Sequence, residues 1–213
     1  MSQALIVVDA QNEFSAQGKR PVPNHAAALA AILCHVERAR RDRQPIAWVR
    51  HHNKPTESPA FVPGSWGAEL SPGLSPRTDV GREQLFEKDV FGAFSAAGLE
   101  TWLRSHDVQS VIVVGFYAHM CLSTSAREAL VRGFDVSVDP EATGARDLED
   151  GVLGRQSAEE VRRSTLLHLT NMGVTLVRTP ARVESAAERG TFTGHGTDPL
   201  AVTGAVVRVA GSL

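Results

Sequence analysis

Short apolar runs that alternate with helical patterns constrain the fold of this chain more than any other feature. The strongest strand candidate is Val108–Phe116, which reads VQSVIVVGF, and similar runs occur at Ala4–Asp9 and Ile46–Arg50. Between the last two, His25–Arg41 has apolar residues at the spacing of one helix face. Such alternation predicts parallel strands with helices packed on both faces of the sheet.

The rest of the chain continues this alternation. The pattern predicts further strands at Gln84–Glu87, Phe134–Val138 and Val174–Arg178, and further helices around Leu99 and Leu103, at Cys121–Gly133 and at Ala158–Met172. We therefore expect an α/β domain over residues 1–180. Its architecture would be three-layer and doubly wound, with a mostly parallel sheet of about six strands and helices on both faces.

Two segments fall outside this pattern. His52–Arg82 is rich in Pro, Gly and Ser and is interpreted as a long excursion, a kind of segment that often carries function. Residues 181–213 form a tail rich in Gly and Thr with a short strand candidate at Ala205–Val209. The tail could pack on the domain, reach a neighbouring subunit or stay mobile, and the sequence leaves these alternatives open.

Composition excludes several classes of protein. The chain has 213 residues, of which 42% are hydrophobic and 22% are charged, so it can bury a core and is not generally disordered. Its formal net charge of −2 argues against nucleic acid or an anionic membrane as the main partner. Two cysteines, Cys34 and Cys121, cannot make a disulfide framework, and neither a basic leader nor a span of transmembrane length is visible. These features predict a cytoplasmic protein.

Polar residues follow several of the predicted strands. In parallel sheets, ligands bind at the carboxyl ends of strands, near the point where the strand order reverses. That rule selects Asp9, Arg50–His52, Lys88 and Phe116–Cys121. We expect these segments to form one site.

Cys121 is the candidate nucleophile of this site. It comes directly after a strand and a short turn, where a helix begins, and the helix dipole there favours the thiolate. The unpaired N–H groups of that turn could bind an oxyanion, Asp9 could accept the thiol proton, and Lys88 could stabilise both anions. Taken singly, Cys121 also fits a small core residue, Asp9 a cap and Lys88 a surface charge.

Three motifs in this order resemble one known family. Asp9–Phe14 (DAQNEF) resembles the pattern D-x-Q-N-x-F. The second block starts at Lys88 and continues with Ala93, Phe94, Leu99 and Leu103. The third block is Gly115–Cys121 (GFYAHMC), which continues with Ala126, Ala129 and Gly133. Over about residues 4–180, the chain is similar to the isochorismatase-like cysteine hydrolases.

The resemblance implies a catalytic triad of Asp9, Lys88 and Cys121. In it, Asp9 takes the thiol proton, Cys121 attacks and Lys88 stabilises the ionised pair. The backbone N–H groups of Tyr117 and Cys121 would form the oxyanion hole, with a non-proline cis peptide bond between Phe116 and Tyr117. The thioester would be hydrolysed by a water molecule that Asp9 activates. The resemblance also implies a homo-oligomer, dimer or larger, and no cofactor.

Two residues depart from the cysteine branch of that family. Ala118 and His119 stand where that branch usually has Thr-Asp, and Tyr-Ala-His instead resembles the isochorismatases that cleave a vinyl ether and have glycine at the position of Cys121. The leading hypothesis is a cofactor-independent hydrolase of a small amide, carbamoyl or ureido compound. The alternatives are a vinyl-ether hydrolase that uses Asp9 without the thiol, and a non-catalytic ligand-binding relic. Nucleotide binding is disfavoured, because no G-x-G-x-x-G follows the first strand and no P-loop is present.

A metal site is not expected. Nicotinamidases of the family hold a metal with an Asp-x-His pair after the second strand, whereas this chain has Val49–His52 (VRHH) without an acidic partner. His51 and His52 point in opposite directions on an extended chain and cannot easily share an ion. One of the two could instead line the pocket.

Four further side chains are candidate substrate contacts: Phe14, Trp66, Phe94 and His119. Trp66 lies in Pro63–Glu69 (PGSWGAE), which resembles a family segment that borders the active site. Aromatic residues near strand ends also fit the core, so both interpretations stay open for these residues. Cys34, on a helix face, is expected in the core.

Overall fold

Six parallel strands form the central sheet. The computed structural model describes residues 2–77 and 81–181. The strand order is β3-β2-β1-β4-β5-β8, and every pair of neighbours is parallel. The strands are β1 (Ser2–Val8), β2 (Ile46–His51), β3 (Glu83–Lys88), β4 (Val108–Gly115), β5 (Asp135–Thr143) and β8 (Thr175–Leu176).

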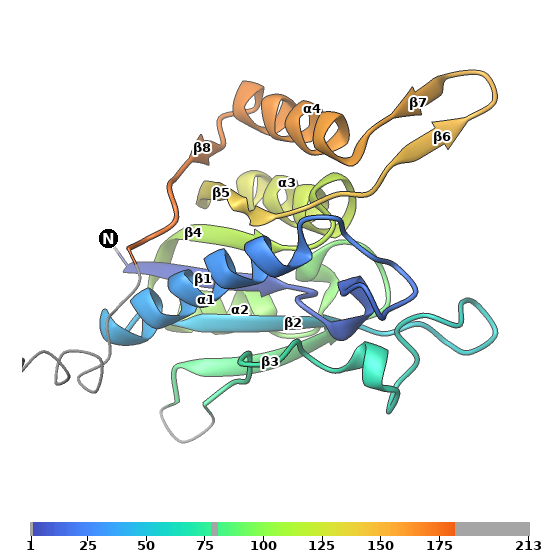
Figure 1. Cartoon of the computed structure of the whole chain (residues 1–213). Coiled ribbons are helices and arrows are strands. Elements are labelled where there is room, and N and C mark those ends of the chain that lie inside the picture. The colour runs from blue at the N-terminus through green and yellow to red at the C-terminus, as the bar shows by residue number, and fades with distance from the viewer. Residues whose placement is uncertain (1, 78–80, 182–213) are drawn as a thin grey trace, which may run out of the picture. The chain divides into compact units, whose positions relative to one another are not determined.

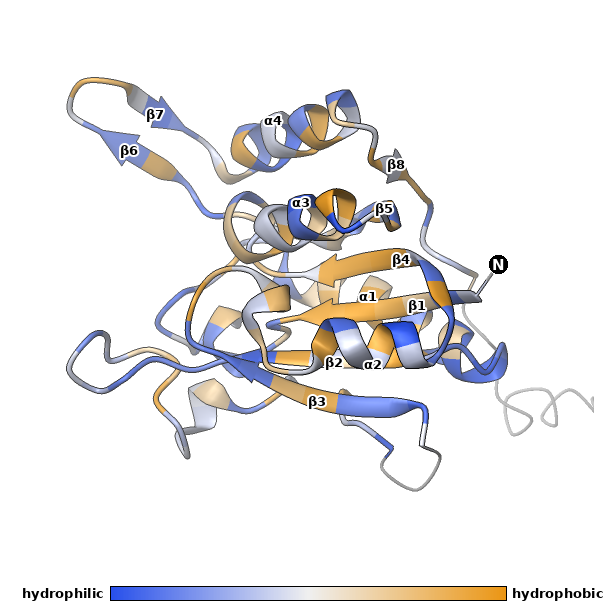
Figure 2. Ribbon diagram, turned by 180° about the vertical axis from the view of Figure 1, so that it is seen from behind, coloured by the Kyte–Doolittle hydropathy of each residue, from blue (hydrophilic) through white to orange (hydrophobic). Residues whose placement is uncertain are grey.

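Helices cover both faces of this sheet. They are α1 (His25–Arg41), α2 (Leu99–Ser105), α3 (Ser123–Val131) and α4 (Ala158–Asn171). Figure 1 shows α1 in front of the strands and α2 behind them, and Figure 2 shows the opposite face, where α2 lies in front. The α3 and α4 helices share the core of the α2 face. The predicted three-layer, doubly wound α/β fold is thus confirmed.

Strand β1 supplies both hydrophobic cores because its side chains alternate between the two faces. Leu5 and Val7 pack with α1, whereas Ile6 and Val8 pack with α2 and α3. At its end, β1 passes so close to β4 that a Cβ on Gly115 would lie 1.8 Å from the Val8 carbonyl oxygen. Gly115 also has a φ of 120°, which favours glycine. Glycine therefore ends β4 at the point where the cysteine turn begins.

Several predicted boundaries are wrong. The segment predicted as a helix from Cys121 starts earlier, as one π-helical turn at Ala118–Leu122, and continues as α3. Strand β5 is longer than Phe134–Val138 because it bends past a register irregularity to pair Thr143 with Gly115. Strand β8 is shorter than predicted, since only two of its residues pair with β5.

A projecting hairpin was not predicted. It consists of β6 (Leu148–Asp150) and β7 (Gly154–Gln156), paired in antiparallel register. Its strands are polar and largely exposed, so neither shows the apolar run by which the buried strands are recognised. The tail predicted at 181–213, with its strand candidate at Ala205–Val209, lies outside the described residues except for Ala181.

The topology places a ligand site between β1 and β4. From β1 the chain builds β2 and β3 on one side and then returns to β4 on the other side, so the strand order reverses there. Asp9 follows β1, and Phe116 begins the turn after β4.

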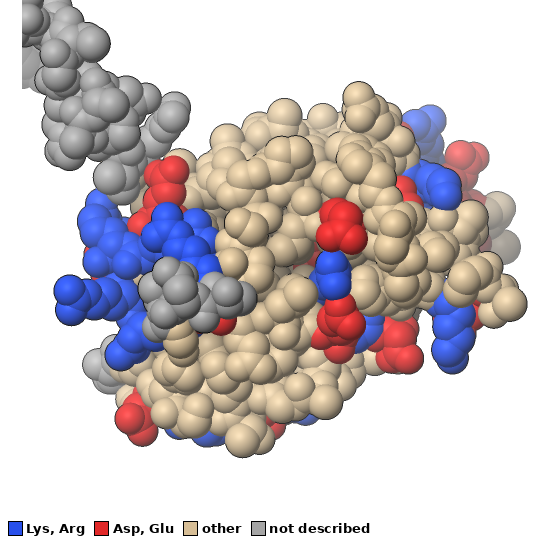
Figure 3. Space-filling view, turned by 90° about the horizontal axis from the view of Figure 1, so that it is seen from below, with Lys and Arg blue, Asp and Glu red and all other residues tan. Residues whose placement is uncertain are grey.

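Arginines gather on the molecular surface near the end of α1 and the start of β3 (Figure 3). They lie beside the amino ends of β2 and β3, away from this site. No helix in the described part of the chain combines the length and apolar character that crossing a bilayer requires.

Candidate active site

A cavity of about 260 Å³ lies at the carboxyl ends of the strands. Its walls come from the turns after β1, β2 and β4 and from the loops that follow Phe14, β3 and β5. The lining residues are Asp9, Phe14, Arg20, His51, Asn53, Ser58, Phe61, Phe91, Tyr117, Met120, Cys121 and Arg146. The structure thus brings the ends of β1, β2 and β4 together, as the sequence predicts.

A buried ion pair forms the floor of the site. The Lys88 ammonium donates to Oδ2 of Asp9 over 2.8 Å, and both side chains are almost completely buried. Oδ1 of Asp9 is buried and has no hydrogen-bond partner among the described residues. Burial alone would lower the pKa of Lys88, but the Asp9 carboxylate and Cys121 together shift it upward. Lys88 is therefore a cation, and one oxygen of Asp9 is left available.

His51 completes the surroundings of Lys88. Its Nδ1 lies 3.2 Å from the Lys88 Nζ, and its Nε2 lies 2.8 Å from Oδ1 of Asn53. Since an ammonium can only donate, Nδ1 accepts from Lys88 and Nε2 donates to Asn53. Gln11 fixes the backbone of His51 by accepting from its N–H and donating to its carbonyl oxygen, both over 2.9 Å. Lys88 is thus oriented by two acceptors.

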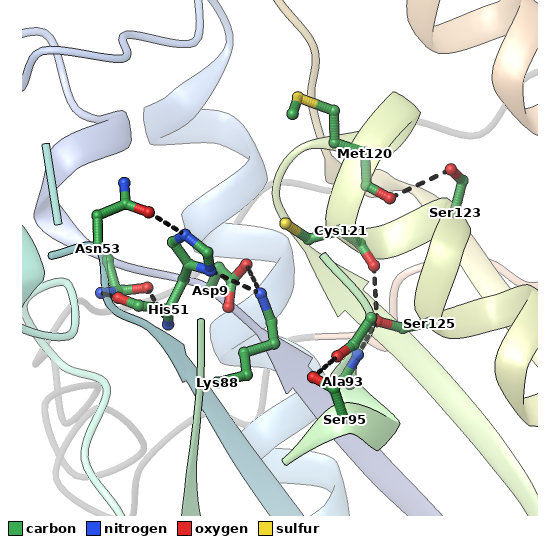
Figure 4. Close-up of polar contacts among 12 residues, drawn as sticks. Asp9, His51, Asn53, Lys88, Ala93, Ser95, Met120, Cys121, Ser123 and Ser125 are labelled. Atoms are coloured by element: carbon green, nitrogen blue, oxygen red, sulfur yellow. Dashed lines mark hydrogen bonds and ion pairs between the residues drawn. The ribbon is translucent and has the colours of Figure 1, made fainter. Parts of the chain in front are cut away.

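The thiol of Cys121 points toward the Asp9–Lys88 pair (Figure 4). Burial raises the pKa of this thiol, Asp9 raises it further, and Lys88 offsets only part of the rise. The expectation of a stabilised thiolate is therefore wrong in direction: at neutral pH the thiol is protonated. The sequence argument placed Asp9 beside the thiol, but it took the thiol pKa from the helix end and left out the effects of burial and of the Asp9 charge on that pKa.

Backbone contacts fix the turn that carries Cys121. The Phe116–Tyr117 peptide bond is cis, as the family resemblance implies. Ala118 donates from its N–H to the Gly144 carbonyl over 2.8 Å, whereas the N–H of Tyr117 has no acceptor among the described residues. On the other side, the Ser125 hydroxyl donates to the Cys121 carbonyl over 2.6 Å and accepts from the N–H of Ala93 over 2.9 Å (Figure 4).

One of the four predicted substrate contacts lines the cavity, and the other three lie elsewhere. Phe14 lines the cavity, but Trp66, Phe94 and His119 do not. Trp66 is about half exposed, and its carbonyl oxygen accepts from the Asn12 side chain and from the N–H of Glu69. Phe94 packs against Phe134 in the core of the α2 face and under the Arg132 guanidinium.

His119 lies behind the wall of the cavity. Its ring stacks on Tyr117 with 5.1 Å between centroids, and neither of its buried ring nitrogens has a hydrogen-bond partner among the described residues. Burial, assisted by the Arg146 charge, lowers the pKa of His119 to about 4. His119 is therefore neutral at physiological pH.

The residues after β2 do not fit a metal site of the nicotinamidase kind. Both nitrogens of His51 have other partners, and the Lys88 ammonium beside Nδ1 would repel a cation. His52 turns away toward Glu87, with 3.8 Å between its Nδ1 and the carboxylate. Within residues 2–77 and 81–181, no group of three or more His, Cys, Asp or Glu side chains is placed to hold a metal ion.

Comparisons with known proteins agree with the fold and the motifs. Residues 3–162 match the family model of the isochorismatase domain. The secreted isochorismatase effector Isc1 of Verticillium dahliae is 34% identical over 68% of this chain and 73% of its own. Nicotinamidase 3 of Arabidopsis thaliana is 30% identical over 70% of this chain and 78% of its own. The crystal structure of an isochorismatase from Pseudomonas putida superimposes with a TM-score of 0.76 at 26% identity, over 83% of this chain and 88% of that one.

The site and these matches define an α/β hydrolytic enzyme with its pocket at the switch point of a parallel sheet. The chain belongs to the isochorismatase family, and it is a hydrolase.

Sequence reasoning missed much of the cavity wall. Arg20, Asn53, Phe61, Phe91 and Arg146 all lie on irregular loops, where no periodicity reports which way a side chain points. The only signal that the sequence offers for these residues is that each lies in a loop next to a predicted strand. That signal did identify His51, one of the two histidines considered for the pocket wall.

Proposed function

We propose that this chain is a cofactor-independent amidohydrolase that cleaves a small amide, carbamoyl or ureido compound through a thioester on Cys121. The observation that carries the proposal is the Cys121 thiol beside a carboxylate, one oxygen of which has no partner among the described residues, in a cavity large enough for a small substrate. The raised pKa of the thiol keeps it protonated before attack. A neutral thiol needs a base at the moment of attack, and Asp9 is the carboxylate that faces it.

Acylation follows from these positions. Oδ1 of Asp9 accepts the thiol proton as Sγ of Cys121 attacks the carbonyl carbon, which forms the C–S bond and turns the carbonyl oxygen into an oxyanion. The backbone N–H of Tyr117, which lacks a protein acceptor among the described residues, donates to that oxygen together with the N–H of Cys121. When the intermediate collapses, the C–N bond breaks and Asp9 returns the proton to the leaving nitrogen.

Deacylation uses the same carboxylate in the same order. A water molecule that replaces the amine loses a proton to Asp9 and attacks the thioester, and collapse of the second intermediate breaks the C–S bond. The thiol is restored by the proton held on Asp9. Throughout, Lys88 keeps its charge, which stabilises the carboxylate before each proton transfer and the thiolate after it.

A vinyl-ether hydrolase is the second candidate. It is favoured by Tyr117-Ala118-His119 and by the isochorismatase from P. putida among the structural relatives. In that reaction Asp9 would protonate the substrate and Cys121 would have no covalent role.

The variant Cys121→Ala separates the two candidates. Under the amidohydrolase proposal, it should lower kcat/KM by at least about 10³-fold toward the best substrate of an amide and ureide screen. Quenched wild-type reactions should show the acyl or carbamoyl mass on the peptide that contains Cys121. An active Cys121→Ala enzyme, or turnover without any adduct under single-turnover conditions, would overturn the proposal, and vinyl-ether substrates would then be tested. Arg163→Gln changes an exposed residue of α4 and is the control for the general effect of a substitution, so it should leave kcat/KM unchanged.

A further inference from the structure

A second cavity, of about 340 Å³, lies at the amino ends of β2 and β3. The described residues that line it are Arg40, Arg43, Gln44, Arg77, Arg82 and Glu83, and we call it the arginine cavity. The active site lies at the opposite ends of the same two strands, since His51 ends β2 and Lys88 ends β3. The mechanism proposed above therefore uses none of the residues of the arginine cavity.

Glu83 is the one acidic side chain among these lining residues, and its acceptor positions are occupied. Oε1 of Glu83 accepts from Nε of Arg40 over 2.8 Å. Oε2 accepts from Nη2 of Arg40, from Nε1 of Trp48 and from the backbone N–H of Arg77, each over 3.0 Å. Four donors fill the acceptor positions of a carboxylate. Glu83 thus neutralises Arg40 and is not available to a second guanidinium.

The other three arginines of the cavity have no counterion. Within residues 2–77 and 81–181, the guanidiniums of Arg43, Arg77 and Arg82 take part in no ion pair. Their one hydrogen bond is to the backbone: Nη1 of Arg82 donates to the Arg43 carbonyl oxygen over 3.4 Å. Like charges that gather without counterions repel one another and destabilise the compact state. An anion bound in the cavity would remove that repulsion.

The carboxyl end of α1 explains only part of this cluster. Cations in the last turn of a helix interact favourably with its dipole, which accounts for the basic residues there, Arg40 among them. Arg77 and Arg82 come instead from the segment that precedes β3. Arg43 follows the helix with a φ of 54°, in the left-handed region where glycine is favoured at a helix end. An arginine at this position carries a backbone cost that the helix itself does not require.

We propose that the arginine cavity binds an oligophosphate anion. Each guanidinium presents a planar fork of donors that matches two oxygens of a phosphate group. Three such forks around one cavity match an anion that carries several charged groups in a row. The cavity is also larger than the active-site cavity of about 260 Å³. Free tripolyphosphate and the triphosphate of a nucleotide both offer this chemistry. The proposal does not depend on the amidohydrolase mechanism, because it involves neither Asp9 nor Cys121.

Calorimetric titration with tripolyphosphate at low ionic strength tests the proposal. Wild type should show one saturable site per chain, and added NaCl should weaken the binding. The variants Arg43→Gln, Arg77→Gln and Arg82→Gln should each raise Kd by about threefold to tenfold. Inorganic phosphate should bind at least about tenfold more weakly than tripolyphosphate, because a single phosphate reaches fewer guanidiniums. A titration with ATP distinguishes the two sources: tighter binding than tripolyphosphate assigns the site to a nucleotide, and equal or weaker binding assigns it to the free anion.

Two controls make the outcome specific. Arg41→Gln removes an exposed arginine from the same end of α1, but this arginine pairs with Asp42 and does not line the cavity. It should leave Kd at the wild-type value. Protein alkylated at Cys121 should also bind tripolyphosphate with the wild-type Kd, because the active site lies at the other end of the strands.

Four results would overturn the proposal. The first is the absence of saturable tripolyphosphate binding in wild-type protein whose circular dichroism is native. The second is a Kd that all three cavity variants leave unchanged. An equal rise of Kd in Arg41→Gln would mean that the anion responds only to the net charge of this face. A loss of binding after alkylation of Cys121 would place the anion in the active site instead.

Discussion

Two buried carboxylates in this molecule have similar partners and different surroundings. Asp9 meets Lys88, and Asp139 meets Nε2 of His35, each over 2.8 Å. Asp139 has every oxygen engaged: Oδ2 also accepts from the Thr179 hydroxyl, and Oδ1 accepts from the N–H of Glu141. Asp9 has one buried oxygen without a partner in the described residues, and that oxygen belongs to a residue that lines a cavity.

The difference is the one expected between a structural carboxylate and the general base of the proposed mechanism. A buried carboxylate with all acceptors used stabilises the fold and cannot easily take a proton. A buried carboxylate with an unused acceptor is costly, so its position calls for an explanation, and proton transfer from Cys121 supplies one. Asp9 has a φ of 50°, unusual for a residue other than glycine, whereas Asp139, in β5, has no positive φ. Under the proposed mechanism, the same chemical group therefore serves two purposes in one sheet.

The largest expected effect is on turnover, which should fall when Asp9 is changed and stay nearly constant when Asp139 is changed. Asp9→Asn should lower kcat by about 10²- to 10⁴-fold, because it removes the proposed general base and keeps the side-chain volume. The matched variant Asp139→Asn should keep kcat/KM within about threefold, because it makes the same chemical change at the satisfied carboxylate. Steady-state kinetics on the best amide or ureide substrate checks both. Equal losses in the two variants would remove Asp9 from its catalytic role.

The fold was predictable from the sequence to the extent that its elements are buried. Strands β1, β2 and β4 have apolar runs, and the strand-end rule then selects four segments, among them Asp9, Lys88 and Phe116–Cys121. The β6–β7 hairpin could not be predicted in this way because its exposed, polar strands have no such run.

The pairing partners of buried polar groups were beyond the reach of the sequence. The hydrogen bond between His35 and Asp139 joins residues 104 positions apart, so no local pattern reports it. Likewise, the pKa of Cys121 is set by burial and by Asp9, so the helix-end argument gave the wrong direction. Long-range contacts decide such properties, and periodicity reports only local structure.

The second effect is on stability, to which both carboxylates contribute. Asp9→Asn should lower the free energy of unfolding by about 3–5 kcal/mol, because it leaves the buried Lys88 ammonium without its counterion. Asp139→Asn should cost about 2–3 kcal/mol, because buried donors from His35, Thr179 and Glu141 lose a charged acceptor. Urea unfolding followed by circular dichroism measures both. A smaller loss in Asp9→Asn than in Asp139→Asn would contradict the role of Asp9 as the counterion of Lys88.

The third effect concerns the protonation of Cys121 and has the opposite sign to the effect on turnover. Because the Asp9 carboxylate helps to raise the pKa of the thiol, Asp9→Asn should increase the thiolate fraction, and with it the rate of iodoacetamide alkylation, by about tenfold at pH 8. In wild type, the rate at Cys121 should still rise about tenfold per pH unit between pH 7 and 9, where an ordinary thiol begins to level off. Alkylation of Cys34 in the same samples is the internal reference. A plateau for Cys121 below pH 8 in wild type would contradict the raised pKa.

The smallest effect is the acid sensitivity that Asp139 gives to the fold. Burial by itself raises the pKa of Asp139, but the hydrogen bonds from His35, Thr179 and the Glu141 N–H outweigh it, so the pKa in the folded protein lies below its usual value. A carboxyl with a lowered folded pKa adds stability above its unfolded pKa of about 3.9, and that contribution disappears as the pH falls through the folded value. The difference in Tm between wild type and Asp139→Asn should therefore be constant from pH 7 to 5 and shrink by a few degrees between pH 4 and 2. A difference that stays constant down to pH 2 would show that the hydrogen-bonded carboxylate adds nothing through its charge, and the contrast with Asp9 would then rest on the free oxygen alone.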